Sequence, residues 1–356
     1  MVRHAVIVAL IAATSATVAC GANEEAPFSV ASRHGKAAPA KASPADTSAS
    51  PADTAPPEGT APPEGTGEPP AAGTFPDISF ELSSMVDPAS EAQKCKFVQV
   101  PTDRGTIAVP AAESHFTPGS HHFLAYRTGL TALPDQYPGV VDCFETLGGA
   151  MGFVAGSYYE AQQPDMHHDL PAGVAHLFQP GEVILLQAHY LNTTLDQLDA
   201  KVTFTLHTMN PADVEHEAGS ILFSNFQLNI PPNSKVTETR SCPVATDTDM
   251  HVSLLWSHMH RRAVRFVATT DDPSVDGMLY ESDDWNEPKA RDFADGPPTI
   301  VHAGKNITFS CDFDNTTSMT FTYGPSADTN EMCILHGMYW PRVDTLTEMC
   351  LLGSSP

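Results

Sequence analysis

The sequence predicts an all-β protein in which two tandem antiparallel β-sandwiches follow a disordered N-terminal segment. From Phe75 onward, short runs rich in β-branched and aromatic residues alternate with turns rich in Pro, Gly, Asn and Asp, and few windows carry a helical period. Many short strands at this spacing are typical of antiparallel sandwiches. Residues 75–356 suit two sandwiches of roughly 100 residues better than one.

The chain begins with the pattern of an export signal. Residues 1–19 combine a basic residue, an apolar run over 5–13 and small residues before Cys20. The tetrad Thr17-Val18-Ala19-Cys20 resembles a bacterial lipobox, with Thr in place of the usual Leu. We therefore expect an exported lipoprotein of the bacterial cell envelope, in the outer membrane or facing the periplasm, whose lipid anchor is Cys20. Plain secretion is the alternative.

Residues 20–74 are predicted to hold this anchor and a disordered linker. Between Asn23 and Gly73 the composition is dominated by a few residue types that are small, polar or proline, and the strings PADT and APPEGT each occur twice. Such a segment cannot bury enough apolar area to fold. Beyond it we place an N-terminal domain over 75–209 and a C-terminal domain over 210–356, since a predicted strand ends just before this boundary.

Six strands stand out within these two domains, each a β-rich run bounded by turn residues. They are Val183 to Tyr190, Lys201 to Leu206, Ser220 to Leu228, His251 to Thr269, Asn306 to Phe313 and Met332 to Trp340.

The composition limits the function classes. Against 18 Lys and Arg there are 43 Asp and Glu, a formal charge of -25, so the surface repels phosphate backbones and nucleic-acid binding is excluded. Besides Cys20 there are six cysteines, which in an exported chain predict three disulfides among 15 possible pairings. No later stretch approaches the roughly 20 apolar residues of a membrane span, so we expect membrane contact only through the lipid anchor.

Histidines are frequent, and the pattern of some favours metal binding. In Leu255-Trp256-Ser257-His258-Met259-His260, a strand period of two places Trp256, His258 and His260 on one face. Two imidazoles that project side by side are a moderately specific metal signal. The alternative is a pair of exposed or core histidines.

Three further patterns are weaker by themselves. His121 and His122 follow a Pro-Gly-Ser turn that could direct both side chains to one point, and His189 ends an apolar stripe that also holds Gln187. A lone histidine in such a stripe is more often a core residue.

On the run Met332 to Met338, strand alternation aligns Met332, Ile334, His336 and Met338. Methionine is usually core filler, but a thioether beside imidazoles favours Cu(I). The histidines at 115, 207, 216, 251 and 302 lack partners at a useful spacing. His167 and His168 could bind a metal ion, but they are predicted to lie in a solvated loop.

Taken in order, four motifs resemble the copper type II, ascorbate-dependent monooxygenases, the group of dopamine β-monooxygenase and peptidylglycine α-hydroxylating monooxygenase. They are SHH at 120, LQAHY at 186, SHMH at 257 and NEMCILHGMYW at 330. The resemblance extends from about Cys95 to Cys350 and includes motif order and approximate spacing. It implies two jelly-roll-like sandwiches that face each other across a cleft, each holding one copper.

The resemblance also implies roles for individual residues. His121, His122 and His189 match the copper that stores and delivers an electron, and the catalytic copper, where dioxygen reacts, matches His258, His260 and Met332. Gln187 is expected to line the cleft. The implied disulfides are Cys95 with Cys143, Cys242 with Cys350 and Cys311 with Cys333.

The substrate pocket departs from the peptidylglycine enzymes. Those members grip a carboxylate with Arg, Asn and Tyr, whereas the matching positions here are Trp256, Ile334 and His336. We therefore expect an apolar wall from Trp256 and Ile334 and a substrate other than peptidylglycine. His336 is a fourth ligand, a hydrogen-bond donor to substrate or a core histidine.

The sequence thus predicts a monomeric copper monooxygenase that hydroxylates a C–H bond of a small molecule with O2 and a one-electron donor such as ascorbate. The alternative is a surface sandwich that binds copper or a partner without turnover.

Overall fold

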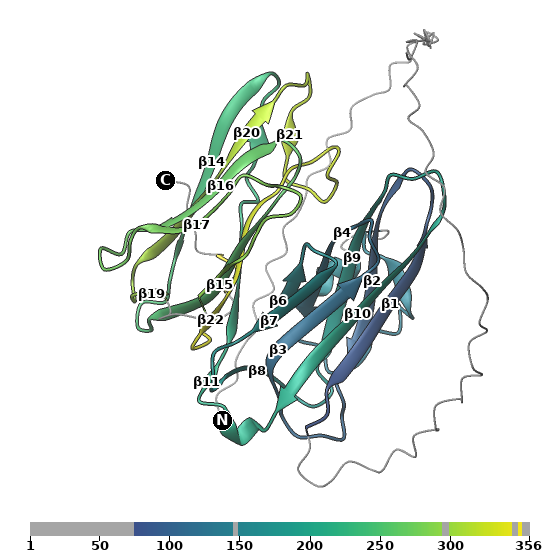
Figure 1. Cartoon of the computed structure of the whole chain (residues 1–356), viewed down its shortest axis with the longest axis vertical. Helices are drawn as coiled ribbons and strands as arrows, with labels where there is room; N and C mark the ends of the chain where they lie inside the picture. The colour runs from purple at the N-terminus through teal and green to yellow at the C-terminus, as the bar shows by residue number, and fades with distance from the viewer. Residues whose placement is uncertain (1–74, 145–148, 294–298, 344–347, 351–356) are drawn as a thin grey trace, which may run out of the picture. The chain divides into compact units, whose positions relative to one another are not determined.

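The computed structural model describes residues 75–144, 149–293, 299–343 and 348–350 (Figure 1). Their regular structure is almost all strand, with two short 3-10 helices, η1 (Ala150–Phe153) and η2 (Pro211–Asp213), so the prediction of an all-β sandwich fold is confirmed. The described residues all fall within one compact unit. No helix in the described ranges is long and apolar enough to cross a membrane. The predicted signal peptide, Cys20 and the linker lie outside the described residues.

The first half of the described chain forms two sheets, antiparallel except for one short pair of strands. We call one the outer N-terminal sheet; its strands, in order, are β1 (Ile78–Val86), β10 (Leu198–Met209), β3 (Ile107–Phe116), β8 (Val174–Phe178) and β11 (His216–Glu217), with β7 (Asp165–Asp169) also on β3. The inner N-terminal sheet holds β5 (Val140–Asp142), β2 (Ser90–Gln99), β9 (Val183–Asn192), β4 (Ser120–Arg127) and β6 (Gly156–Ala161). Phe123, Phe178 and Phe204 are among the buried residues of the core between them.

The inner N-terminal sheet is buried on both faces. Along β9, Ile184, Leu186 and Ala188 belong to the core shared with the outer sheet. The alternate positions Val183 and Leu185 pack in a second apolar cluster on the opposite face. Gln187 and His189 continue this second stripe, because side chains two apart share a face.

The second half forms another pair of sheets. We call one of them the inner C-terminal sheet; it contains β12 (Gly219–Ser224), β22 (Cys333–Trp340), β15 (Met250–Met259), β18 (Arg291–Asp292) and β19 (Thr299–Val301). The outer C-terminal sheet contains β14 (Ser234–Pro243), β20 (Asn306–Asn315), β16 (Ala263–Thr270) and β17 (Met278–Ser282). A small ribbon joins β13 (Asn229–Ile230) to β21 (Phe321–Thr322). One large apolar cluster contains residues of both sheets.

The prediction of one strand over His251 to Thr269 is wrong. The chain turns at 260–262, where the amide of Ala263 donates to the carbonyl of His260 at 3.0 Å. β15 lies in the inner sheet and β16 in the outer sheet. The run 251–269 contains no Gly, Pro, Asn or Asp, so no turn residue marks the break in the sequence.

The pairing of the strands changes over residues 210–218. β10 ends at Met209, and the short β11 still pairs, in parallel, with β8 of the outer N-terminal sheet. β12 then begins at Gly219 and pairs with β22. The division into domains at 209 and 210 stays a prediction.

Three disulfides form, with the pairing that the family resemblance implied. They join Cys95 to Cys143, Cys242 to Cys350 and Cys311 to Cys333. The third links β20 of one C-terminal sheet to β22 of the other.

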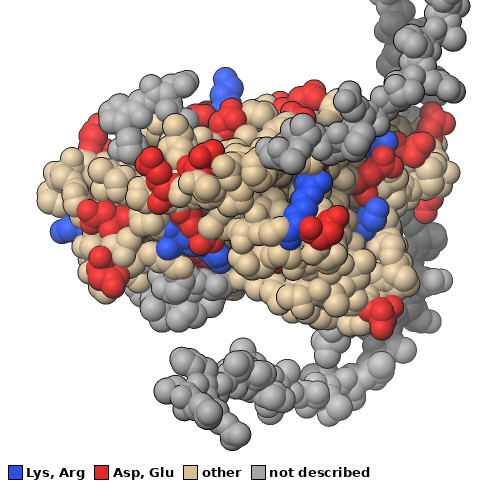
Figure 2. All heavy atoms as spheres, turned by 90° about the horizontal axis from the view of Figure 1, so that it is seen from below, with Lys and Arg blue, Asp and Glu red and all other residues tan. Residues whose placement is uncertain are grey.

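Acidic side chains are spread over the surface. On the face shown in Figure 2, red carboxylate groups outnumber the blue cationic ones, as the composition leads one to expect.

Candidate metal centres

Three predicted histidines converge on the inner N-terminal sheet because of a β-bulge. His122 lies directly opposite His189 on the neighbouring strand, whereas Ser120 lies opposite Tyr190, so His121 is an extra residue between two paired positions. A regular strand would point His121 and His122 to opposite faces. In the bulge, one ligand atom each from His121, His122 and His189 lie within 4.8 Å of one another.

The ring nitrogens of these histidines fit a metal ion. His189 donates from Nε2 to Glu91 Oε1 at 2.7 Å, which leaves a lone pair on Nδ1. Three buried nitrogens of this group have no hydrogen-bond partner: Nδ1 of His189, Nε2 of His121 and Nδ1 of His122. Buried nitrogens without partners are costly, and a metal ion bound by them would remove this cost.

The second predicted group lies where β15 and β22 pair. Trp256 is opposite His336 and His258 is opposite Ile334, so the predicted common face of these residues exists. His260 follows the end of β15; its Nδ1 donates to the carbonyl of Asn330 at 3.3 Å, and its Nε2 is buried without a partner. The rings of His258 and His260 are 5.3 Å apart between centroids.

Burial holds His121, His122, His258 and His260 in the neutral form. Loss of contact with water lowers the pKa of His121 to about 3 and that of His260 to about 4, and it lowers the pKa of His122 and His258 well below the usual range. Neutral imidazole is the form that binds metal ions. These residues are therefore ready to act as ligands at neutral pH.

This burial predicts how the stability of the metal-free protein depends on pH. In the unfolded chain His121 binds a proton below about pH 6.5, whereas the folded protein admits it only near pH 3. The free energy of unfolding should therefore fall as the pH is lowered from about 6.5 to about 3. His121 should contribute up to about 1.4 kcal/mol to this fall per pH unit. Urea unfolding from pH 7 to pH 4 should give a shallower decline for His121→Asn than for wild type. An unchanged slope would contradict the prediction.

The two groups of ligands lie against each other. The ring of His122 is 4.8 Å from that of His258, and the ring of His121 is 5.8 Å from it. The family resemblance implied two copper sites that face each other across a cleft. Here the histidine rings of the two groups are in contact, so the two sites lie closer together than expected.

A cavity of about 370 Å³ borders both groups and is mainly apolar. His122 lines it from the inner N-terminal sheet, and His258 and Met332 line it from the C-terminal side. Its apolar lining includes Leu124, Val154, Leu222, Ile334 and Met349. Gln187 also lines it, accepting from the Tyr126 hydroxyl at 3.0 Å and donating to Gln93 at 2.7 Å.

One expected pocket residue is displaced. Trp256 is not among the described residues that line the cavity, because its indole is stacked between His168 and His336. The apolar wall is formed by Ile334 without Trp256. His336 does line the cavity, and its Nδ1 is 2.6 Å from Oε2 of Glu160.

No pattern in the sequence pointed to Glu160. Its carboxylate is fully buried, lines the cavity and contacts both His336 and, at 3.9 Å, His258. Glu160 is separated from these histidines by 98 or more residues, and no local spacing marks it. The neighbouring Gln162 amide lies 2.7 Å from His258 Nδ1 and holds that ring in position.

A second residue without a sequence signal, Glu91, contacts the surroundings of both groups. Besides binding His189, its Oε1 accepts from the amide of Ala327 at 3.1 Å, and its Oε2 accepts from the Ser326 hydroxyl at 3.0 Å. The bond from His189 is the main reason that the pKa of Glu91 is lowered to about 2. Residues 325–331, which we call the bridging loop, end next to Met332.

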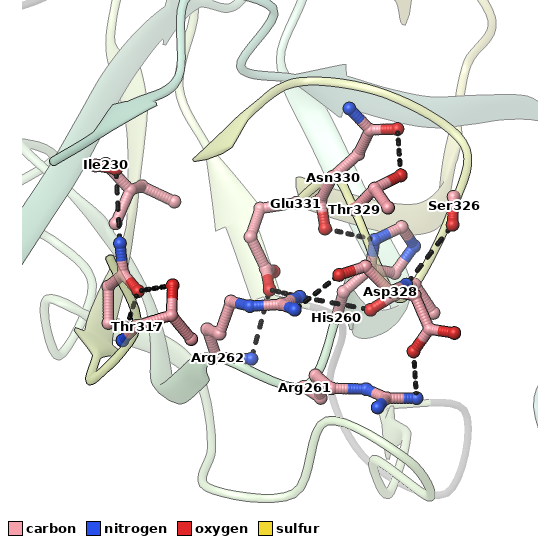
Figure 3. A network of polar contacts seen from close by, with 12 residues as sticks. Ile230, His260, Arg261, Arg262, Thr317, Ser326, Asp328, Thr329, Asn330 and Glu331 are labelled. Carbon is pink, nitrogen blue, oxygen red and sulfur yellow. Dashed lines mark hydrogen bonds and ion pairs between the residues drawn. The ribbon is translucent and has the colours of Figure 1, made fainter. Parts of the chain in front are cut away.

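Two arginines hold the other side of the bridging loop (Figure 3). Arg262 donates to Ala327 O at 3.1 Å and to Glu331 Oε1 at 3.2 Å, while Arg261 pairs with Asp328 at 2.7 Å. Burial nevertheless raises the pKa of Glu331 to about 7. Both arginines follow His260 directly, so the turn that ends β15 fixes the loop that leads to Met332.

Comparisons with known proteins agree with this chemistry for the second half of the chain. Residues 216–355 match the family model described as copper type II ascorbate-dependent monooxygenase, C-terminal domain. No curated protein matches the chain. Matching solved structures include "Crystal Structure of the STIV MCP" (8% identity, 75% of this chain and 97% of that chain, TM-score 0.31) and "PBCV-1 virus capsid, quasi-atomic model" (7%, 76% and 95%, TM-score 0.24).

The matched segment contains His258, His260 and Met332 together with the bridging loop. Residues 216–355 therefore belong to the copper type II ascorbate-dependent monooxygenase family, as its C-terminal domain.

Proposed function

We propose that the protein is a copper-dependent monooxygenase that hydroxylates a C–H bond of a small molecule, with O2 and an external one-electron donor such as ascorbate. The observation that carries this proposal is the pair of unlike ligand groups, in ring contact, at the border of one apolar cavity. His121, His122 and His189 would hold one copper, and His258, His260 and Met332 the other. Bound copper would supply electron transfer at the first group and activation of O2 at the second.

The protein's own residues would position the substrate and exclude water. Leu124, Ile334 and Met349 make the cavity apolar beside His258 and Met332. Gln187 is fixed by Tyr126 and Gln93 and offers a polar group next to the three-histidine site. A volume of about 370 Å³ suits a small molecule.

The charges around the cavity disfavour an acidic substrate. The described residues that line it include no Lys or Arg, so a carboxylate would find no cationic partner there. The buried Glu160 would repel an anion at short range. We infer a neutral or cationic substrate and not a peptide C-terminal glycine.

The cellular setting is part of the proposal. The signal pattern of 1–19 and the lipobox-like tetrad favour an exported bacterial lipoprotein, held to the cell envelope by Cys20 and a linker over 20–74. We propose a monomer whose partners are O2 and the small substrate.

The copper content of the purified protein tests this function. After exchangeable metal is removed by dialysis, we expect two copper ions per chain in wild type, and one in each of the variants Met332→Ala and His189→Ala, because each variant removes a ligand from a different site. Met319→Ala and His216→Ala change exposed residues of the same types and should keep both ions. Turnover of a screened substrate under ascorbate and O2 should be lost in both ligand variants.

Fewer than one copper in wild type would contradict the proposal. Two coppers without turnover of any substrate would favour a copper-binding protein that performs no reaction.

A further inference from the structure

A third group of possible ligands lies on the outer N-terminal sheet. Glu113, His167 and His207 come from the adjacent strands β3, β7 and β10, with Glu113 on the central one. Glu113 is directly opposite His167, and His207 lies two residues along β10 from Thr205, which is opposite Glu113. All three side chains therefore project from the same face of the sheet.

The distances within this group suit a metal ion. Oε2 of Glu113 is 3.6 Å from His167 Nδ1 and 3.7 Å from His207 Nε2. One ligand atom from each residue lies within 4.8 Å of the others. Ligand atoms bound tetrahedrally at 2.0–2.1 Å are about 3.4 Å apart, so small side-chain rotations would complete the geometry.

Two further carboxylates orient the imidazoles. His207 Nδ1 lies 2.9 Å from Asp77 Oδ2, and His167 Nε2 lies 3.0 Å from Asp169 Oδ1. A carboxylate that accepts from one ring nitrogen leaves a lone pair on the other, which is how metal-binding histidines are commonly held. His207 Nε2, on the side of Glu113, is buried and has no hydrogen-bond partner.

We propose that Glu113, His167 and His207 bind a divalent transition-metal ion, Zn²⁺ or Cu²⁺, separately from the two copper groups. Two imidazoles and one carboxylate suit these ions, with Cu²⁺ bound more tightly than Zn²⁺. The three side chains are between 32% and 49% exposed, so water fills the remaining coordination positions and the ion exchanges with the medium. Asp77, Asp169 and the net charge of -25 favour a cation here.

The ion would cross-link three strands, so it should also stabilise the folded protein. Binding to the folded state and not to the unfolded chain raises the free energy of unfolding with ion concentration.

The test starts from full-length protein that holds two copper ions per chain after exchangeable metal has been removed by dialysis. This protein is titrated with Zn²⁺, and bound zinc and retained copper are measured by equilibrium dialysis. We expect one zinc per chain in wild type, with copper unchanged, and a higher melting temperature. His207→Ala and His167→Ala should lose this zinc and the rise in melting temperature. Asp77→Asn, which removes only the outer carboxylate, should weaken zinc binding about 10- to 100-fold.

His115→Ala is the matched control, because His115 is an exposed histidine on β3 that pairs with Asp165 and lies outside the three ligands. It should bind zinc as wild type does. Equal zinc binding by His207→Ala and wild type, or no zinc bound by wild type, would overturn the proposal and leave a surface cluster of ion pairs.

Discussion

Replacing Cys311 and Cys333 together with alanine is expected to lower the free energy of unfolding by about 3 kcal/mol, from the entropy of the loop that the disulfide closes. The two residues are 22 apart in the sequence and fully buried. The disulfide also joins the two C-terminal sheets across their core. Urea unfolding of the metal-free double variant measures the loss.

The same change should weaken one copper site selectively. Cys333 follows Met332 directly, so the disulfide holds the segment that presents the thioether. Copper affinity should fall at the site of His258, His260 and Met332 and stay unchanged at the three-histidine site. Removing Cys95 and Cys143 is the control: their sequence separation of 48 predicts a loss of about 4 kcal/mol without this selectivity. Equal copper affinities in the Cys311/Cys333 variant and wild type would contradict the argument.

What the sequence could predict was the part that depends on neighbours along the chain. Strand alternation is a local property, so it placed His258 on one face with Trp256, and the register of β15 and β22 bears this out. The same alternation could not place His121 beside His122, because only the bulge in β4 makes adjacent residues converge. There the family resemblance supplied what the period of two could not.

The parts that were missed depend on contacts between distant segments. Glu91 meets His189 across 98 residues, and Glu160 meets His336 across 176. His207 was predicted to lack a partner, yet the sheet brings it to Glu113, and His167 lies in β7 and not in a solvated loop. Trp256 faces the predicted side, but His168, from the other half of the chain, stacks on it. No spacing in the sequence carries such pairings.

Replacing Glu91 with alanine should weaken copper binding at the three-histidine site about 10- to 100-fold, because a carboxylate that orients a ligand histidine is lost. Glu91 fixes which nitrogen of His189 carries the proton and so keeps the lone pair on Nδ1. Glu91→Gln retains a carbonyl acceptor and should recover part of the affinity. Competition dialysis of copper and the electron paramagnetic resonance spectrum of Cu²⁺ measure both effects.

Glu91→Ala should also weaken copper binding at the site of His258, His260 and Met332. The Glu91 carboxylate holds the bridging loop, which leads to Met332, through Ser326 and Ala327. Hydrogen exchange at the Ala327 amide should become faster in Glu91→Ala. Gln93→Ala separates the two contributions, since the Gln93 side chain donates to Pro325 O at 2.8 Å and makes no hydrogen bond to the ring of His189, the residue opposite it on β9. Gln93→Ala should speed hydrogen exchange in the bridging loop and leave the copper affinity of the three-histidine site unchanged. If Glu91→Ala altered only that site, the loop would be held by Gln93 and Arg262, and the two copper sites would bind independently. A loss of affinity at both sites would instead mean that one partly buried carboxylate supports both of them.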